Sequence, residues 1–300
     1  MKWEGNRESD NVEDRRGEST SGGGGGGGFS GGRLGIGSVV IALVVSYFFG
    51  INPMTVLSLL SGGSAPNSQT GQSDQAANPP SATAPANDKT TRFVRTVLAD
   101  TEDVWGNIFR ASGKEYVRPK LDVFTGSIKT ACGSGDTASG PFYCPGDQKV
   151  YIDLAFFQTM RERFQVSAEF AQAYVIAHEV GHHVQNLSGI SDKVDQQRRT
   201  SSEKQANALS VKLELQADCF AGVWAFHANQ ARSILESGDI DAALKAATAI
   251  GDDTLQRQAR GQVVPDSFTH GSSEQRVRWF KRGIDNGKLN DCNTFGTNQL

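Results

Sequence analysis

The sequence lacks a strong charge of one sign and lacks the motifs of nucleotide-binding proteins. Its 300 residues carry 30 Lys and Arg against 33 Asp and Glu, a formal net charge of −3. Neither sign dominates and no basic patch interleaved with aromatic residues occurs, so nucleic acid is not an expected partner. The glycine run at residues 22–28 follows no strand-like segment and precedes no Gly-Lys-Ser/Thr, which argues against a phosphate-binding loop. No internal repeat is present.

Cysteine is scarce as well. The chain has 4 cysteines, none in Cys-x-x-Cys spacing, which argues against a structural zinc site built from thiolates. Cys132 and Cys144 flank a Gly- and Ser-rich loop between two strand-like segments, so a local disulfide is the simplest interpretation. Cys219 and Cys292 would form the second disulfide. The sequence leaves the other pairings and free thiols open, and disulfides would indicate an oxidising compartment.

The few histidines are concentrated in one place. The chain has 5, and three of them are His178, His182 and His183. A helix turns about 100° per residue, so His178 and His182 lie about 40° apart on one face and can bind one ion. Glu179 lies one step round the helix, where it can accept a proton from a metal-bound water. This spacing is typical of a zinc hydrolase, and the alternative is a chance match.

The residues around this motif predict a helix over 167–187. Ser167 is a candidate N-cap, Glu169 lies in the first turn, and Gly189 can end the helix. Gly181 leaves room for a neighbouring helix to come close. The helical context favours metal binding over chance.

A catalytic zinc site needs a third protein ligand and keeps a fourth position for water. A metzincin would place glycine and histidine where Gln185 and Ser188 stand, so that pattern is excluded. Glu214 is the better candidate, on a second helix whose capping box is formed by Ser202 and Gln205. We therefore expect Zn²⁺ to be held by two histidines and this glutamate.

Asp218 lies four residues after Glu214 and would accept the free N–H of a ligand histidine. The alternative is that both carboxylates belong to a solvated helix face. Residues 213–225 are largely apolar, and carboxylates that face the interior need a cation to face. The surroundings thus favour the metal site.

The pattern His178-Glu179-x-x-His182 with Glu214-x-x-x-Asp218 resembles the gluzincin branch of zinc peptidases. Residues 177–185, 214–225 and 270–280 are similar to the bacterial neutral zinc metallopeptidases of the YpfJ-like family. The resemblance covers the whole chain and implies a membrane-tethered metallopeptidase with a zincin-like fold. It does not imply a physiological substrate.

His270 is a further candidate for catalysis. Residues 269–276 resemble the His-then-Arg segment of HtpX-like and CAAX-processing membrane peptidases, which usually have proline where Gly271 stands. By that resemblance His270 would stabilise the oxyanion on the scissile carbonyl. Arg276 would pair with Asp218 or with a substrate carboxylate. The alternative is a helix-capping histidine and a buried arginine bridge, and His183 and His227 are interpreted as ordinary core or surface residues.

Two functions remain open. In a zinc endopeptidase acting on peptides or unfolded proteins, zinc lowers the pKa of its bound water and Glu179 is the general base that passes the proton to the leaving amine. In a non-catalytic module, the metal would only hold two helices together while the surface recruits a partner. Glu179 favours the endopeptidase, because a structural site needs no general base and prefers four protein ligands.

The first part of the chain predicts a membrane anchor. Residues 1–33 carry too few apolar side chains to fold and would be a disordered cytoplasmic segment. Residues 34–52 are mostly apolar and long enough to cross a membrane once. Basic residues precede this run and the next one is Lys89, which indicates a cytoplasmic N-terminus and a periplasmic or extracellular domain at the bacterial inner membrane. A cleaved signal peptide is the alternative.

Residues 61–90 are rich in Ser, Ala, Pro, Asn, Gln and Gly and would be a flexible linker. The catalytic domain would then comprise residues 91–300, with an α+β fold that has a mainly helical core and a small β-sheet. Strands are expected within 116–130 and 149–157, and the strand at 150–153 could be an edge that pairs with substrate or simply a buried strand. The expected helices are 92–110, 167–187, 203–230, 240–250, 254–260 and 273–284.

Overall fold

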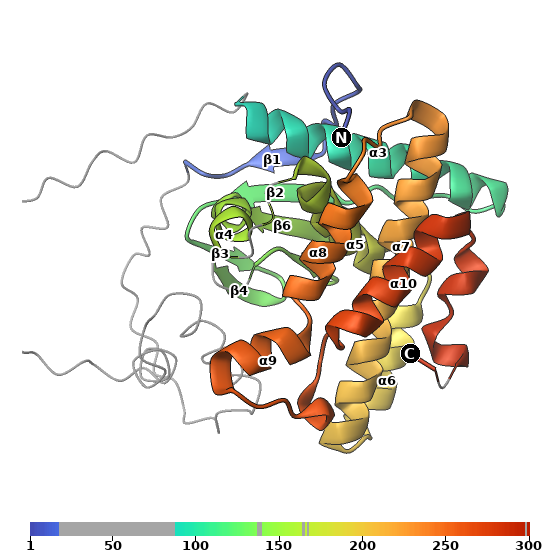
Figure 1. The fold of residues 1–300 in the computed structure, drawn as a ribbon. Helices are drawn as coiled ribbons and strands as arrows, with labels where there is room; N and C mark the ends of the chain where they lie inside the picture. Colours follow the sequence, from blue (N-terminus) through green and yellow to red (C-terminus); the bar gives the residue numbers. More distant parts are fainter. Residues whose placement is uncertain (18–87, 137–139, 164–165, 167, 298) are drawn as a thin grey trace, which may run out of the picture.

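The computed structural model describes the chain except for residues 18–87, 137–139, 164–165, 167 and 298. The described part is mostly helical with a small β-sheet, which confirms the α+β prediction (Figure 1). The sheet lies on one side of a group of packed helices, and α3 (Lys89–Ala111) runs along the edge of the sheet. The helix predicted at 92–110 is therefore present, and it begins with Asp88 as its N-cap.

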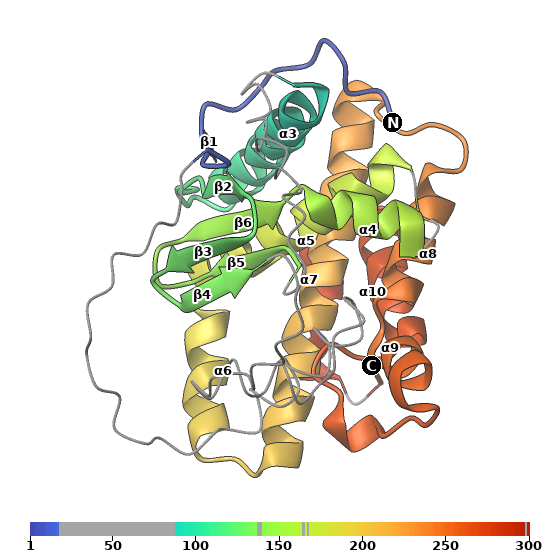
Figure 2. The same ribbon diagram turned by 90° about the vertical axis from the view of Figure 1, so that its left-hand side faces the viewer.

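The main sheet has four strands in the order β1-β2-β6-β5. Its strands are β1 (Val12–Asp14), β2 (Lys120–Phe124), β5 (Phe142–Cys144) and β6 (Lys149–Asp153). The first three in spatial order are parallel, and β5 is antiparallel to β6. A separate hairpin of β3 (Ser127–Thr130) and β4 (Gly133–Asp136) lies at the end of the sheet opposite β1 (Figure 2).

Residues 150–153, for which an edge strand or a buried strand was expected, form an interior strand. β6 pairs with β2 on one side and β5 on the other, so its backbone groups are taken up by the sheet. Of the two alternatives, the structure therefore shows the buried strand. The sequence left the choice open because β5, three residues long, is too short to recognise. Among the described residues, β5 has the outer position beside β6.

The two helices that carry the metal motif pack side by side. α5 (Glu169–Leu187) is almost entirely buried, and α7 (Glu203–Arg232) begins with the predicted capping box of Ser202 and Gln205. The N-cap of α5 is Ala168 and makes no side-chain hydrogen bond; Ser167, predicted for that role, lies outside the described residues. Gly189 has a φ of 67° just after α5, as expected for a residue that ends a helix.

The other helices surround this pair (Figure 1). Those at 240–250, 254–260 and 273–284 were predicted and are present with small shifts of their ends, whereas α4, α6 and the short 3-10 helices were not predicted. The bounds are α4 (Ala155–Arg163), α6 (Ile190–Arg199), α8 (Asp239–Ala249), α9 (Asp252–Arg260), η2 (Pro265–Ser267), α10 (Ser273–Asn286), η3 (Leu289–Cys292) and η4 (Thr294–Gly296).

Glycines allow the close approach of α5, α7 and α10. A Cβ placed at Gly181 would lie 3.0 Å from the Ala217 carbonyl oxygen, so α7 crosses α5 at this point. A Cβ at Gly283 would collide with the Cys219 carbonyl oxygen, and one at Gly222 would collide with the Phe280 carbonyl oxygen. Residues with side chains at these points would push the helices apart. The space predicted beside Gly181 is thus used by the helix that carries the third ligand.

Both predicted disulfides are present. Cys132–Cys144 joins the turn of the β3–β4 hairpin to β5, and Cys219–Cys292 joins α7 to η3. Each closes a loop whose ends are already neighbours in the fold. Cys219 is the residue after Asp218, so the second disulfide ties the chain's C-terminal part to the helix that carries the predicted ligand.

The first 17 residues fold as part of the domain, which corrects the prediction that residues 1–33 are disordered. Trp3 is buried against Phe93 of α3, and Val12 is buried in β1, which extends the sheet. The prediction rested on the low average apolar content of the segment. An average does not show that two separate residues, Trp3 and Val12, are buried, or that polar side chains pair with the rest of the domain. The remaining residues of that segment, 18–33, lie outside the described residues.

No helix in the described part of the chain is long and apolar enough to span a membrane. The anchor predicted at 34–52 and most of the linker predicted at 61–90 lie outside the described residues. The last residues of that linker, from Asp88, are described and already belong to the start of α3.

Candidate metal centre

Two histidines of α5 and one glutamate of α7 converge on one point. The ligand atoms of His178, His182 and Glu214 all lie within 4.8 Å of one another. His178 Nε2 is 3.2 Å from Glu214 Oε2, and His182 Nε2 is 3.6 Å from Glu214 Oε1. The four-residue spacing of the histidines aims both rings from one helix face at the carboxylate of the other helix. The structure thus brings together the three predicted ligands.

Each histidine is oriented by a hydrogen bond from its other ring nitrogen. His178 Nδ1 donates to Asp218 Oδ1 at 2.8 Å, and His182 Nδ1 donates to Gln185 Oε1 at 2.9 Å. Both partners are fully buried, with 0% exposure. Since each Nδ1 carries the proton, each Nε2 is left with a lone pair for an ion, the arrangement that metal-ligating histidines usually have. Asp218 was predicted for this role and Gln185 was not.

Asp218 is the centre of a buried polar network. It accepts hydrogen bonds from Arg276 Nε at 2.8 Å, Arg276 Nη2 at 2.9 Å and the Tyr174 hydroxyl at 2.5 Å. Burial alone would raise the pKa of Asp218, but the Arg276 guanidinium and His178 hold it at about 2. The carboxylate is therefore ionised at neutral pH. Of the two partners predicted for Arg276, the structure shows Asp218.

Glu179 lies beside the three ligand groups without belonging to them. It is buried, at 8% exposure, on the same helix turn as the ligand His178. Burial raises the pKa of its carboxyl above the usual range. A carboxyl next to a metal centre whose pKa lies above its ordinary value is suited to accept a proton and pass it on.

His270 is held in a tight loop that packs on α7. Asp252 Oδ2 accepts the backbone N–H groups of Thr269, His270 and Gly271 at 2.7, 2.6 and 3.0 Å. His270 Nδ1 lies 3.3 Å from Asp252 Oδ1. No sequence pattern indicated the role of Asp252, because this residue lies at the start of α9, well before the loop in the chain. The Asp252 carboxylate thus holds the backbone of the loop and the Nδ1 edge of the His270 ring.

The backbone conformation at Gly271 explains why this chain does not have the proline that the HtpX-like and CAAX-processing peptidases usually have at this position. Its φ is 91°, a value that the proline ring cannot adopt. A Cβ at this residue would lie 3.2 Å from the side chain of Leu215, the neighbour of Glu214. The loop therefore rests on α7 beside the third ligand, and His270 projects from it with about half of its side chain exposed.

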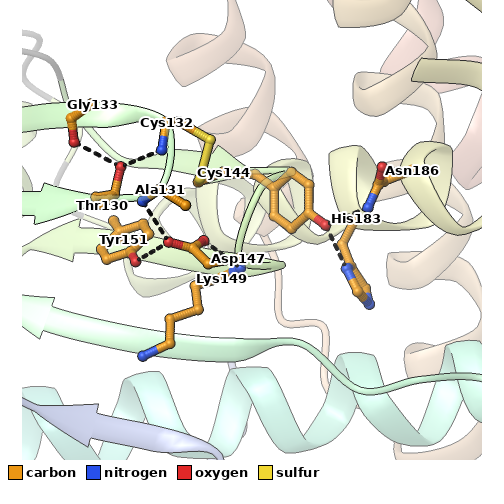
Figure 3. The surroundings of a disulfide bond; sticks show 11 residues. Thr130, Ala131, Cys132, Gly133, Cys144, Asp147, Lys149, Tyr151, His183 and Asn186 are labelled. Carbon is orange, nitrogen blue, oxygen red and sulfur yellow. Dashed lines mark hydrogen bonds between the residues drawn. A yellow bond between two sulfur atoms is a disulfide. The ribbon is translucent and has the colours of Figure 1, made fainter. Parts of the chain in front are cut away.

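His183, interpreted from sequence as an ordinary residue, connects α5 to the sheet. It is fully buried, and its Nε2 donates to the Val117 carbonyl oxygen at 2.7 Å. Its Nδ1 lies 3.0 Å from the Tyr143 hydroxyl (Figure 3). His227, by contrast, donates from Nε2 to the Gly287 carbonyl oxygen, a structural contact as expected. Only the tertiary contacts distinguish these two histidines.

The donor set fits a catalytic zinc ion. Two imidazole nitrogens and one carboxylate oxygen make up a common set of three protein ligands, with a fourth position left for water or substrate. Without a cation, Glu214 and Glu179 would be two buried or half-buried carboxylates, and imidazoles that carry a proton only on Nδ1 are neutral and would not balance their charge. A divalent ion resolves this imbalance.

The sequence profile of one family matches residues 1–295 of this chain, and its description is "Putative neutral zinc metallopeptidase". The chain belongs to this family. The match includes the N-terminal segment as well as the residues of the candidate metal centre. It confirms the resemblance inferred from the motifs.

Similar proteins occur in Escherichia coli and in mycobacteria. "Uncharacterized protein YpfJ" of Escherichia coli (strain K12) is 48% identical over 298 residues, which is 99% of each chain. "Uncharacterized protein Mb2605" of Mycobacterium bovis is 39% identical over 219 residues, 70% of this chain and 73% of the relative. "Uncharacterized protein Rv2575" of Mycobacterium tuberculosis has the same values. No solved structure matches this chain.

Proposed function

We propose that this protein is a zinc endopeptidase that hydrolyses peptide bonds with Glu179 as the general base. The observation that carries the proposal is the convergence of His178, His182 and Glu214 directly beside a buried carboxyl that is not a ligand. Zinc would be held by these three side chains. When bound, it supplies Lewis acidity, which polarises a carbonyl and makes water a better nucleophile at neutral pH.

The protein side chains would supply the proton transfers. Glu179 accepts a proton from the attacking water and donates it to the leaving amine, a role for which its raised pKa is suited. His270 is placed on the loop beside Glu214, where a ring N–H could stabilise negative charge on the carbonyl oxygen. The Asp252 carboxylate would hold this ring in position. These roles rest on placement and chemistry.

The substrate would lie as an extended strand along β5. Its outer side carries backbone groups that β6 does not use, and an extended peptide can add to such an edge. Tyr143 of this strand reaches α5 at His183, the residue after a ligand. A peptide paired with β5 would thus pass close to the metal centre.

The test is zinc content together with cleavage of a mixed peptide library by the full chain, with and without a chelator. Cleavage should require zinc and stop in the Glu179→Gln variant, which keeps its zinc. His178→Ala and His182→Ala should lose both zinc and cleavage. Turnover at the wild-type rate by Glu179→Gln would remove this residue from the role. Bound zinc without any cleavage would favour the non-catalytic interaction module instead.

A further inference from the structure

The candidate substrate strand is held by few backbone bonds. β5 has three residues, paired as Phe142↔Tyr151, Tyr143↔Val150 and Cys144↔Lys149 with β6. A strand this short at the outside of a sheet has little intrinsic stability. Its position relative to the metal centre must therefore depend on side chains.

A chain of hydrogen bonds joins β5 to the metal helix. Because the Val117 carbonyl can only accept, His183 Nε2 carries the ring proton and Nδ1 is the acceptor. The Tyr143 hydroxyl therefore donates to His183 Nδ1, and Asn186 Nδ2 donates to the same hydroxyl oxygen, both at 3.0 Å. Burial raises the pKa of Tyr143 to about 12, so the phenol keeps the proton that it donates.

A second restraint acts on the other side of the strand. The disulfide Cys132–Cys144 ties the end of β5 to the β3–β4 hairpin, and Asp147 accepts from the Ala131 N–H at 3.0 Å and from the Tyr151 hydroxyl at 2.8 Å (Figure 3). The hairpin is thereby fixed to the sheet. Figure 3 shows Tyr143 pointing away from this group and toward His183 and Asn186.

We propose that Tyr143 and His183 are positioning residues for substrate: they hold the backbone of β5 at a set distance from His182. This inference rests on the proposed function. His183 follows the ligand directly on α5, so the hydrogen bond from Tyr143 connects the substrate strand to the helix at the metal centre itself. The two residues act through the strand and do not touch the reacting atoms.

The test is the split between KM and kcat in Tyr143→Phe, measured with a peptide chosen from the library. Loss of one buried neutral hydrogen bond predicts a KM about five-fold higher, with kcat and zinc content unchanged. Tyr116→Phe is the matched control and should leave KM unchanged, because the Tyr116 ring also meets the His183 ring but its hydroxyl makes no hydrogen bond among the described residues. The Cys132→Ser and Cys144→Ser double variant should raise KM in the same direction.

The outcomes separate this inference from the proposed function. Glu179-dependent cleavage with an unchanged KM in Tyr143→Phe overturns the inference alone. A parallel fall of kcat and zinc content would also overturn it, since it would show a general structural defect. Absence of Glu179-dependent cleavage in the unaltered chain overturns the proposed function, and the inference with it.

A second inference concerns the N-terminal segment and comes from different contacts. β1 pairs in parallel with β2 through Val12↔Leu121, Glu13↔Asp122 and Asp14↔Val123. Trp3 Nε1 donates to Glu169 Oε2 in the first turn of α5 at 2.9 Å. Arg16 bonds to Asp14 and lies 2.8 Å from Asp88, the N-cap of α3. The segment thus contacts the sheet and both neighbouring helices.

The N-terminal segment also supplies the hydrogen-bond donors of a buried carboxylate in the domain. The Glu102 side chain has 0% exposure, and it accepts from Arg7 at 2.9 Å, Ser9 at 2.6 Å and Asn11 at 2.7 Å. All three donors come from the N-terminal segment, and Arg118 lies 4.0 Å away. Removing the segment would take these three hydrogen bonds away from the carboxylate.

We infer that residues 1–17 lie on the same side of any membrane as residues 88–300. A chain that crosses a bilayer an odd number of times between residues 17 and 88 would separate Val12 from Leu121 and Arg7 from Glu102. A cytoplasmic N-terminus with an external domain, as the distribution of basic residues predicts, is incompatible with these pairs. The shared side is outside if the two disulfides form in the cell.

The test labels intact cells with a membrane-impermeant maleimide. Glu4→Cys and Lys281→Cys each place a single thiol at an exposed position of the full chain, one in the N-terminal segment and one on α10. If the domain is external, both positions should be labelled in intact cells. If it is cytoplasmic, neither should be labelled until the cells are lysed. Labelling of one position and protection of the other would overturn the inference.

Discussion

Gln185 orients the candidate ligand His182: its Oε1 accepts a hydrogen bond from His182 Nδ1 at 2.9 Å. The amide is itself fixed, because Gln185 Nε2 donates to the Leu213 carbonyl at 2.7 Å and to Gln216 Oε1 at 3.1 Å. Both acceptors lie on α7. The residue therefore connects one ligand histidine to the helix that carries Glu214.

Replacing Gln185 with methionine should weaken zinc binding about 10- to 100-fold, the usual effect of losing a partner that orients a ligand. The fold should be retained, because the two side chains are similar in size. Zinc affinity is measured by competition with a chromophoric chelator. Gln172→Met, which changes the same side chain near the start of α5, is the control and should bind zinc like the unaltered chain.

Replacing Arg276 with methionine should lower the free energy of unfolding by about 3–5 kcal/mol, because it leaves the Asp218 carboxylate buried without its cation. The double variant with Asp218→Asn should lose less than the sum of the two single changes, since the uncompensated charge is gone. Urea unfolding measures all three variants. A loss below about 1 kcal/mol in Arg276→Met would contradict the buried ion pair.

The ionisation of Asp218 predicts acid sensitivity in the metal-free protein. Its pKa in the folded state is about 2, because Arg276 and His178 outweigh the effect of burial. The ordinary value is about 3.9, so the carboxylate adds stability that is complete above about pH 4 and is lost as the pH falls toward 2. The shift corresponds to about 2.5 kcal/mol.

The measurement is the free energy of unfolding between pH 2 and pH 7. Asp218→Asn should lack this part of the pH dependence while other carboxyl groups keep theirs. Equal acid dependence in the two proteins would show that Asp218 is not ionised in the folded state at neutral pH.

Replacing Gly283 with alanine should destabilise the protein by about 2 kcal/mol or more, because the new methyl group meets the backbone of α7 at Cys219 and Val223. Gly106→Ala on α3 is the matched control. No atom lies within 4 Å of a Cβ at that position, and alanine is the better helix former, so stability should stay equal or rise by up to about 1 kcal/mol. Thermal unfolding compares the two.

The ligands and the helices that hold them could be predicted because their signals are local. Spacing along a helix places His178 and His182 on one face, and the capping box at Ser202 marks the start of α7. Asp218 could be predicted because it shares a helix face with Glu214. The partners Gln185, Asp252 and Tyr174 could not, since a glutamine, an aspartate or a tyrosine on a helix has many ordinary uses.

The N-terminal segment and β5 show the limit of local patterns. Trp3 and Val12 are isolated apolar residues, and they are held by contacts with residues far along the chain, among them Phe93 and Leu121. The strand β5 has three residues, too few to show a period of two. Such pairings depend on the whole fold.

The sequence by itself determined the candidate metal site: which side chains converge and which carboxyl stands beside them. These follow from the geometry of one helix and from the cost of burying a charge without a partner. The sequence favoured the two disulfides as the simplest pairing but left the other pairings open. Only the tertiary structure decided that β6 is an interior strand, that His183 joins α5 to β5, and that residues 1–17 belong to the domain. Each of these depends on contacts between residues distant in sequence, for which composition and periodicity carry no signal.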